Sequence, residues 1–159
     1  MDKSALIRSI VSQLEAELAL QTEAAHESRD EATDEESRAE DRFDMRSQSA
    51  AYLAAGQAQM AADIADAIAA WKAMSPRAFA PGDAIAQGAL VTLEGRGRAA
   101  AYLFGPQSGG LEAVDGGVTV TVVTAASPLG RQLLGRRVGD MVQLSDRTGP
   151  VEHRVVSVA

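Results

Sequence analysis

Two long stretches in the first half of the chain carry apolar residues at helical spacing. Each shows the alternating steps of four and three residues that are typical of a coiled-coil seam. The first seam consists of Ile7, Val11, Leu14, Leu18, Gln21, Ala25 and Ser28, with Leu6 and Ile10 beside it. The second consists of Phe43, Arg46, Ala50, Leu53, Gln57, Met60, Ile64, Ala67 and Trp71. The large apolar members lie early in the first seam and late in the second. The pattern therefore predicts an antiparallel helical hairpin, well packed at its base and thinly packed at its far end.

An acidic stretch, Asp30 to Asp44, lies where this hairpin would turn. It holds eight carboxylates and two arginines, a charge of −6 in a chain of net charge −7. Thr33-x-x-Glu36 and Ser37-x-x-Glu40 each fit a capping box, and either could open the second helix. Capping explains one or two of the acids. The others form either a solvated acidic loop or a functional tip.

After Trp71 the apolar pattern changes its period. Turn clusters rich in glycine separate five short segments of β-branched or aliphatic residues. The segments are Ala89–Leu93, Ala99–Phe104, Val118–Thr124, Met141–Leu144 and His153–Val158. They predict five strands in a mostly antiparallel sheet.

A short helix is predicted between the third and fourth of these segments. Ser127 suits the cap position, Pro128 the first helical position, and Gly135 the position just past the end. Leu129, Leu133 and Leu134 would share one face and pack on the sheet.

Charge and glycine content divide the chain near Ser75-Pro76. Residues 1–75 carry 15 acids and 7 bases, whereas residues 76–159 carry 7 acids and 8 bases. Thirteen of the 14 glycines and all five prolines lie in the second part. The predicted fold class is therefore α+β. An antiparallel coiled-coil hairpin (1–75, tip about 30–44) precedes a small antiparallel sheet packed on one short helix (76–159).

Several classes of function are disfavoured by composition. There is no cysteine, and the two histidines, His26 and His153, lie far apart, so a metal site built on these side chains is not expected. No apolar run is long enough to cross a bilayer, and we expect a cytoplasmic protein without membrane contact. The net charge of −8 on residues 1–75 disfavours direct binding of nucleic acid by the hairpin.

The segment SPLGRQLLGRRVGDMVQL (127–144), with the later strand EHRVVSVA (152–159), resembles the C-terminal domain of bacterial Gre-type transcript cleavage factors. The order of parts is also similar. The resemblance implies an FKBP-like second domain that docks at the rim of the secondary channel of RNA polymerase. The hairpin would reach down that channel. The protein would act as a monomer. Its tip acids would help to hold a Mg²⁺ ion in the polymerase active site, so that a backtracked transcript is cut near its 3′ end. The chain would then be no enzyme and would have no cofactor of its own; it would stimulate cleavage by the polymerase.

The resemblance also implies site residues. The family tip reads Asp-x-x-Glu-Asn, and alignment on Glu40 places Ser37 at the aspartate. Glu36 and Glu40, four residues apart, are the expected catalytic carboxylates and Mg²⁺ ligands. The alternates are Asp34, Glu35 and Asp41. The expected partner-binding residues are Ser127, Pro128, Leu129, Arg131, Arg136 and Arg137.

Two alternatives remain open at this stage. A tip that departs from the family motif could bind in the channel and modulate or inhibit the polymerase without cleavage. An FKBP-like folding helper with a dimerising hairpin is the other. It is disfavoured because residues 76–159 hold only three aromatic residues, Phe79, Tyr102 and Phe104.

Overall fold

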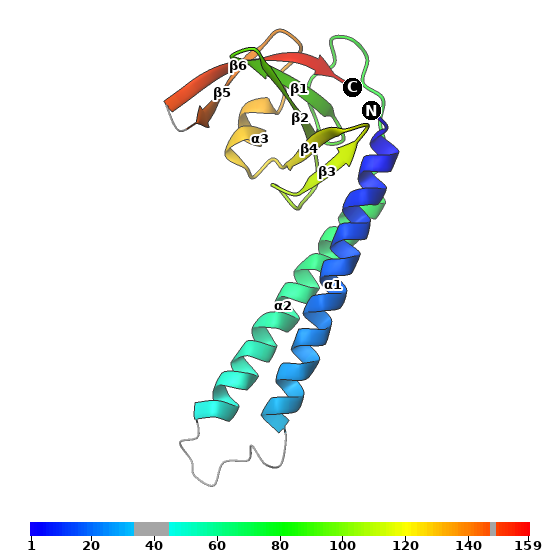
Figure 1. The fold of residues 1–159 in the computed structure, drawn as a ribbon. Helices are drawn as coiled ribbons and strands as arrows, with labels where there is room; N and C mark the ends of the chain where they lie inside the picture. Colours follow the sequence, from blue (N-terminus) through cyan, green and yellow to red (C-terminus); the bar gives the residue numbers. More distant parts are fainter. Residues whose placement is uncertain (34–44, 147–148) are drawn as a thin grey trace. The chain divides into compact units, whose positions relative to one another are not determined.

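The computed structural model describes residues 1–33, 45–146 and 149–159 (Figure 1). Two long helices come first, α1 (Lys3–Thr33) and α2 (Met45–Ala73). The later elements are β1 (Leu90–Gly95), β2 (Arg98–Phe104), β3 (Glu112–Asp115), β4 (Val118–Val123), α3 (Pro128–Leu133), β5 (Met141–Asp146) and β6 (Gly149–Val158). The predicted α+β fold class is confirmed.

The chain divides into two compact units. Residues 12–69 form one, and residues 1–11 together with 70–159 form the other. The first turns of α1 and the last residues of α2 therefore belong with the sheet. The boundary predicted near Ser75-Pro76 stays a prediction.

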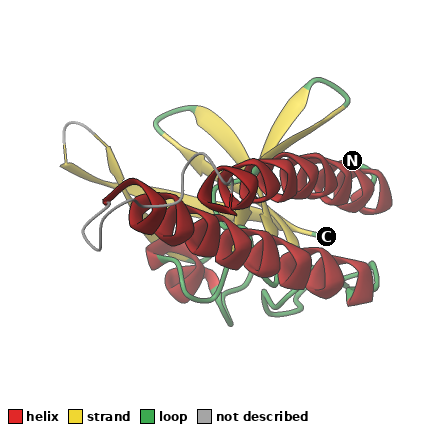
Figure 2. Cartoon of the chain, turned by 90° about the horizontal axis from the view of Figure 1, so that it is seen from below, coloured by secondary structure: helices red, strands yellow, loops and turns green. Residues whose placement is uncertain are grey.

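In the unit of residues 12–69, α1 and α2 run side by side in opposite directions, as both views show (Figures 1 and 2). Alanine, the best helix former, is abundant in both helices, and Gly56 is the one glycine in either. The predicted antiparallel hairpin is confirmed. Within the described ranges, no helix has the length and hydropathy needed to cross a membrane.

The seam predicted for α2 is wrong in register at two positions. Leu53 and Met60 are 56% and 49% exposed, whereas Ala54 and Ala61, one residue later, are partly buried. The inward residues on α2 are Ala54, Gln57, Ala61, Ile64, Ala67, Ile68 and Trp71. Small side chains thus replace the larger neighbouring residues on the inner face. Phe43 lies outside the described residues, as do the side chains of Ser28, Arg46 and Ala50.

The distal half of the hairpin is loosely filled, as the small seam residues predicted. A hollow of about 270 Å³ lies between the helices. It is lined by Thr22, Ala25, His26, Arg29, Ala54, Ala58 and Ala61. In contrast, Leu14 on α1 is almost fully buried. Packing is therefore strongest toward the base, where the larger apolar residues lie.

The N-terminal end of α1 is fixed by its cap and by the sheet unit. Ser4 N donates to Asp2 Oδ1 over 2.8 Å, so Asp2 caps the helix. Asp2 N in turn donates to Asp115 Oδ2 at the end of β3, also over 2.8 Å. Lys3 Nζ donates to the carbonyls of Arg77 and Gly88 and lies over the Phe79 ring. Burial, and secondarily Arg77, lowers the pKa of Lys3.

The sheet has six strands in the order β3-β4-β2-β1-β6-β5. All neighbouring pairs are antiparallel except β2 and β4, which are parallel. The prediction of five strands missed β3. Only two of its four residues, Ala113 and Val114, are apolar, and the glycine turn that follows dominated the pattern. Gly116 and Gly117 make that turn with φ of 57° and 80°, which is the β-hairpin connection to β4.

The core of the sheet unit lies on both faces of the sheet. One cluster joins the strands to α3 and contains Ile85, Ala89, Val91, Leu93, Phe104, Val123, Leu133, Val142 and Val155. Trp71, at the end of α2, is fully buried. A Cβ atom added to Gly105 would lie 2.5 Å from the Trp71 ring, so the indole packs directly on the backbone that follows β2.

Candidate partner-docking site

The predicted tip carboxylates lie outside the described residues. Asp34, Glu35, Glu36, Glu40 and Asp41 all fall in the segment 34–44. The helices that bound this segment are described, and they end at Thr33 and begin at Met45. The assignment of Glu36 and Glu40 to Mg²⁺ therefore stays a prediction.

The predicted docking segment, in contrast, is described in full and begins with a helix cap. Gly130 N donates to Ser127 Oγ over 2.9 Å, and this hydroxyl donates to Thr124 O, also over 2.9 Å. Ser127 has extended backbone angles (φ −72°, ψ 151°), and Pro128 starts the helix. The predicted capping role of Ser127 is confirmed.

A close backbone approach holds the first turn of α3, and no pattern in the sequence predicted it. Gly130 is buried, and a Cβ atom at this position would lie 1.8 Å from Thr124 O. No real side chain tolerates such a contact with a backbone oxygen. Gly130 is therefore required because the loop after β4 crosses the helix at this residue.

The prediction that three leucines of this helix pack on the sheet is wrong for one of them. Leu133 is fully buried and Leu129 packs against the core, but Leu134 is 53% exposed. Leu134 is the C-cap residue, with ψ of 123°, so it has left the helical path and its side chain no longer follows the helix face. Gly135 follows with φ of 81°, as predicted for the position past the end.

Three arginines accompany the exposed Leu134. Arg131 Nη1 donates to Ala126 O over 2.6 Å, and Arg136 Nε donates to Gln132 O over 3.3 Å. Arg137 donates through Nη1 to Gly82 O and through its backbone to Asp140 Oδ2. Each guanidinium has five N–H donors and remains exposed, so most of its donors face solvent.

Val138, close to these residues in the sequence, is 50% exposed. We call Arg131, Leu134, Arg136, Arg137 and Val138 the α3 patch. Two exposed aliphatic side chains beside three cations, on a segment fixed by cap and backbone contacts, are suited to a protein partner with apolar and acidic groups. The sequence indicated the arginines, whereas Leu134 and Val138 were found only from their exposure.

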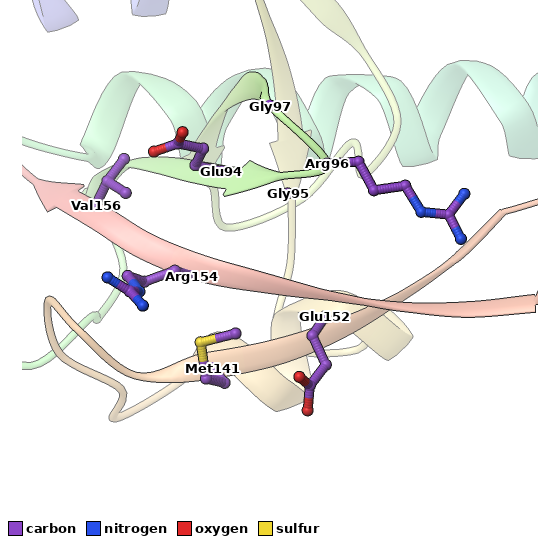
Figure 3. Close-up of a pocket in the computed structure, with 8 residues that line it drawn as sticks. All are labelled: Glu94, Gly95, Arg96, Gly97, Met141, Glu152, Arg154 and Val156. Carbon is purple, nitrogen blue, oxygen red and sulfur yellow. The ribbon is translucent and has the colours of Figure 1, made fainter.

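A second surface feature is a shallow hollow of about 400 Å³ on the sheet (Figure 3). Its lining residues are Glu94, Gly95, Arg96, Gly97, Met141, Glu152, Arg154 and Val156. Strand pairing places Glu94 opposite Arg154, and Arg154 opposite Met141. In Figure 3 the side chains of Glu94, Arg96 and Glu152 point in different directions. Because the polar groups do not converge, this hollow has the character of a solvated sheet face.

No candidate metal centre occurs in the part of the chain that the structure describes, where no three potential ligands gather. Nδ1 of His153 lies 3.0 Å from Val151 O. His26 is exposed and lines the hollow between the helices.

Comparison with known proteins gives matches only among solved structures. No family model and no curated protein matches the chain. Three solved structures similar to it are two Gfh1 proteins and one elongation factor. The GreA factor homolog 1 (Gfh1) of Thermus thermophilus is 25% identical, with 94% of each chain covered and a TM-score of 0.39. Gfh1 of Thermus aquaticus is also 25% identical, with 92% of each chain covered and a TM-score of 0.39.

The third is the elongation factor GreA/GreB of Nitrosomonas europaea. It is 17% identical, with a TM-score of 0.38, and the match covers 65% of this chain and 79% of that one. With sequence identities and TM-scores this low, the matches do not identify functional residues, which have to be found on this chain itself.

Proposed function

We propose that this chain is a transcription elongation factor that binds RNA polymerase as a single copy in the cytoplasm. In this proposal the hairpin enters the secondary channel, and carboxylates of the 30–44 stretch support Mg²⁺-dependent cleavage of backtracked transcripts. The observation that carries the proposal is the position of the acids. Two of the eight carboxylates of the stretch 30–44 lie at the end of α1, and six lie in the segment 34–44 that connects two antiparallel helices of 31 and 29 residues.

The chemistry of the acids suits this role. Carboxylate oxygens are hard ligands that Mg²⁺ prefers, and two-metal sites activate water and stabilise a leaving oxygen. A helix of about 30 residues spans roughly 45 Å, so the two helices form a long hairpin. The factor would supply ligands, and the polymerase would supply the remainder of the catalytic site.

The outer surface of α2 supports burial of the hairpin against another protein. Tyr52, Leu53 and Met60 are 86%, 56% and 49% exposed. They lie in the stretch 47–62, which contains no charged residue although the hairpin as a whole is strongly acidic. Large exposed apolar residues in an uncharged part of an acidic hairpin are typical of an interaction surface.

The test of cleavage uses the tip acids. We expect the unmodified protein to release a short 3′ fragment from a backtracked elongation complex. Glu36→Ala combined with Glu40→Ala should lower the cleavage rate by about 10- to 100-fold, because metal ligands are lost. The control is Glu17→Ala with Glu23→Ala, which removes the same charge from exposed positions of α1. If the unmodified protein releases no fragment at any Mg²⁺ concentration, the cleavage claim is wrong.

The test of docking uses charge reversal. Arg136→Glu with Arg137→Glu should weaken polymerase binding roughly tenfold, because two cations of the α3 patch become anions. The matched control is Arg96→Glu with Arg98→Glu on the β1–β2 hairpin, which should have a smaller effect. Affinity is measured by titration of labelled protein, with circular dichroism to confirm that both variants fold. Equal losses in the two variants would contradict docking through the α3 patch.

The sequence of the tip favours one alternative. Ser37 stands where the family motif has an aspartate, so the tip can occupy the channel without the usual ligand pair. In that case the protein would inhibit nucleotide addition and release no fragment. The same backtracked complex, supplied with nucleotides, distinguishes the two functions.

A further inference from the structure

The side chain of Gln132 makes the hydrogen bonds to the backbone of Gln143 that a neighbouring strand would make. Nε2 of Gln132 donates to Gln143 O over 2.9 Å, and Gln143 N donates to Oε1 of Gln132 over 2.8 Å. Gln143 is in the middle of β5, the last strand in the sheet order. One carboxamide thus makes both hydrogen bonds that a residue of a seventh antiparallel strand would exchange with Gln143.

From this pair we infer that Gln132 is a positioning residue for the α3 patch. It fastens α3 to the outer edge of β5, and so fixes the neighbouring Leu134 and Arg136 relative to the sheet. This inference rests on the proposed docking function of the patch. It adds a residue that does not itself have to touch the partner.

The need for such an attachment follows from the length of α3. A helix of six residues has too few internal hydrogen bonds to be stable alone. The Ser127 cap and Gly130 hold its first turn. After the helix, Gly135 N donates to Ile85 O, and Ile85 N donates to Arg136 O, over 2.9 and 2.7 Å. Those contacts join α3 to the segment before β1, whereas the Gln132 carboxamide joins it by hydrogen bonds to the edge strand.

The chemistry of the pair selects glutamine. Gln143 presents one backbone donor and one backbone acceptor, so its partner must offer both. A glutamate at position 132 would accept from Gln143 N but would place a second acceptor against Gln143 O. A leucine would offer neither and would leave two backbone groups of an edge strand free for another strand.

The experiment compares Gln132→Leu with Gln143→Ala in the full chain. Because Gln143 contributes only backbone atoms to the pair, Gln143→Ala keeps both hydrogen bonds and serves as the matched control. Amide hydrogen exchange at position 143, corrected for intrinsic rates, should be about tenfold faster in Gln132→Leu than in the control. Polymerase affinity should fall several-fold in Gln132→Leu and remain unchanged in the control.

Each outcome has a separate meaning. Unchanged protection of the amide at 143 in Gln132→Leu would overturn the pairing, whatever the polymerase result. Faster exchange with unchanged affinity would overturn the positioning role. If the unmodified protein does not bind polymerase, the proposed function fails, and with it the docking role of Gln132. The exchange measurement still decides independently whether the carboxamide closes the β5 edge.

Discussion

Gly130→Ala is expected to lower the free energy of unfolding of the sheet unit by about 3 kcal/mol or more. The added methyl group would lie 1.8 Å from Thr124 O and 2.7 Å from the carbonyl carbon of that residue. Both are backbone atoms, so the clash can be relieved only if α3 or the loop after β4 moves. Such a movement would also break the hydrogen bond that the capping hydroxyl of Ser127 donates to the same Thr124 O. Chemical denaturation followed by Trp71 fluorescence measures the loss.

The matched control is Gly109→Ala. Its methyl group would approach the same threonine, but at 3.4 Å from the side chain, which is ordinary contact. We expect a change within about 0.5 kcal/mol for this variant. If the two substitutions have equal effects, the close approach at Gly130 does not determine the stability of this region.

Trp71→Ala is expected to cost about 3–5 kcal/mol, because a fully buried indole is removed and a cavity remains. Trp71→Phe should cost much less. It keeps an aromatic ring against Gly105 and removes Nε1, a buried donor without a hydrogen-bond partner among the described residues. Denaturation followed by circular dichroism is suitable, since both variants lack the only tryptophan. Similar losses in the two variants would contradict a packing role for the ring.

Features set by neighbouring residues could be predicted from the sequence. The N-cap of α3 is predicted from Ser127, Pro128 and the helical pattern that follows them. The glycine after the end of α3 is predicted because the chain reverses there. The long helices follow from apolar spacing and from the lack of proline. The α+β order of the two halves follows from the change of period after Trp71.

Features set by distant residues could not be predicted in the same way. On α2, Leu53 and Ala54 are adjacent in the sequence, and packing against α1 determines which of the two side chains faces inward. The parallel pairing of β2 with β4 depends on β3, whose four residues carry a weak pattern. The contact of Gln132 with Gln143 joins two polar residues that no periodicity connects. The tip acids were identified from their sequence, and their assignment to Mg²⁺ still stands as a prediction.

The hydrogen bond between Asp2 N and Asp115 Oδ2 joins residues 113 positions apart. We expect a contact of such long sequence separation to form late in folding, because a large loop must close first. During synthesis the hairpin can assemble while the strands are still being made, because the parts of α1 and α2 that contact each other both lie within residues 12–69. The first turn of α1, however, can contact Asp115 only after β3 has been synthesised. We therefore expect the two ends of this one helix to reach their final contacts at different times during synthesis.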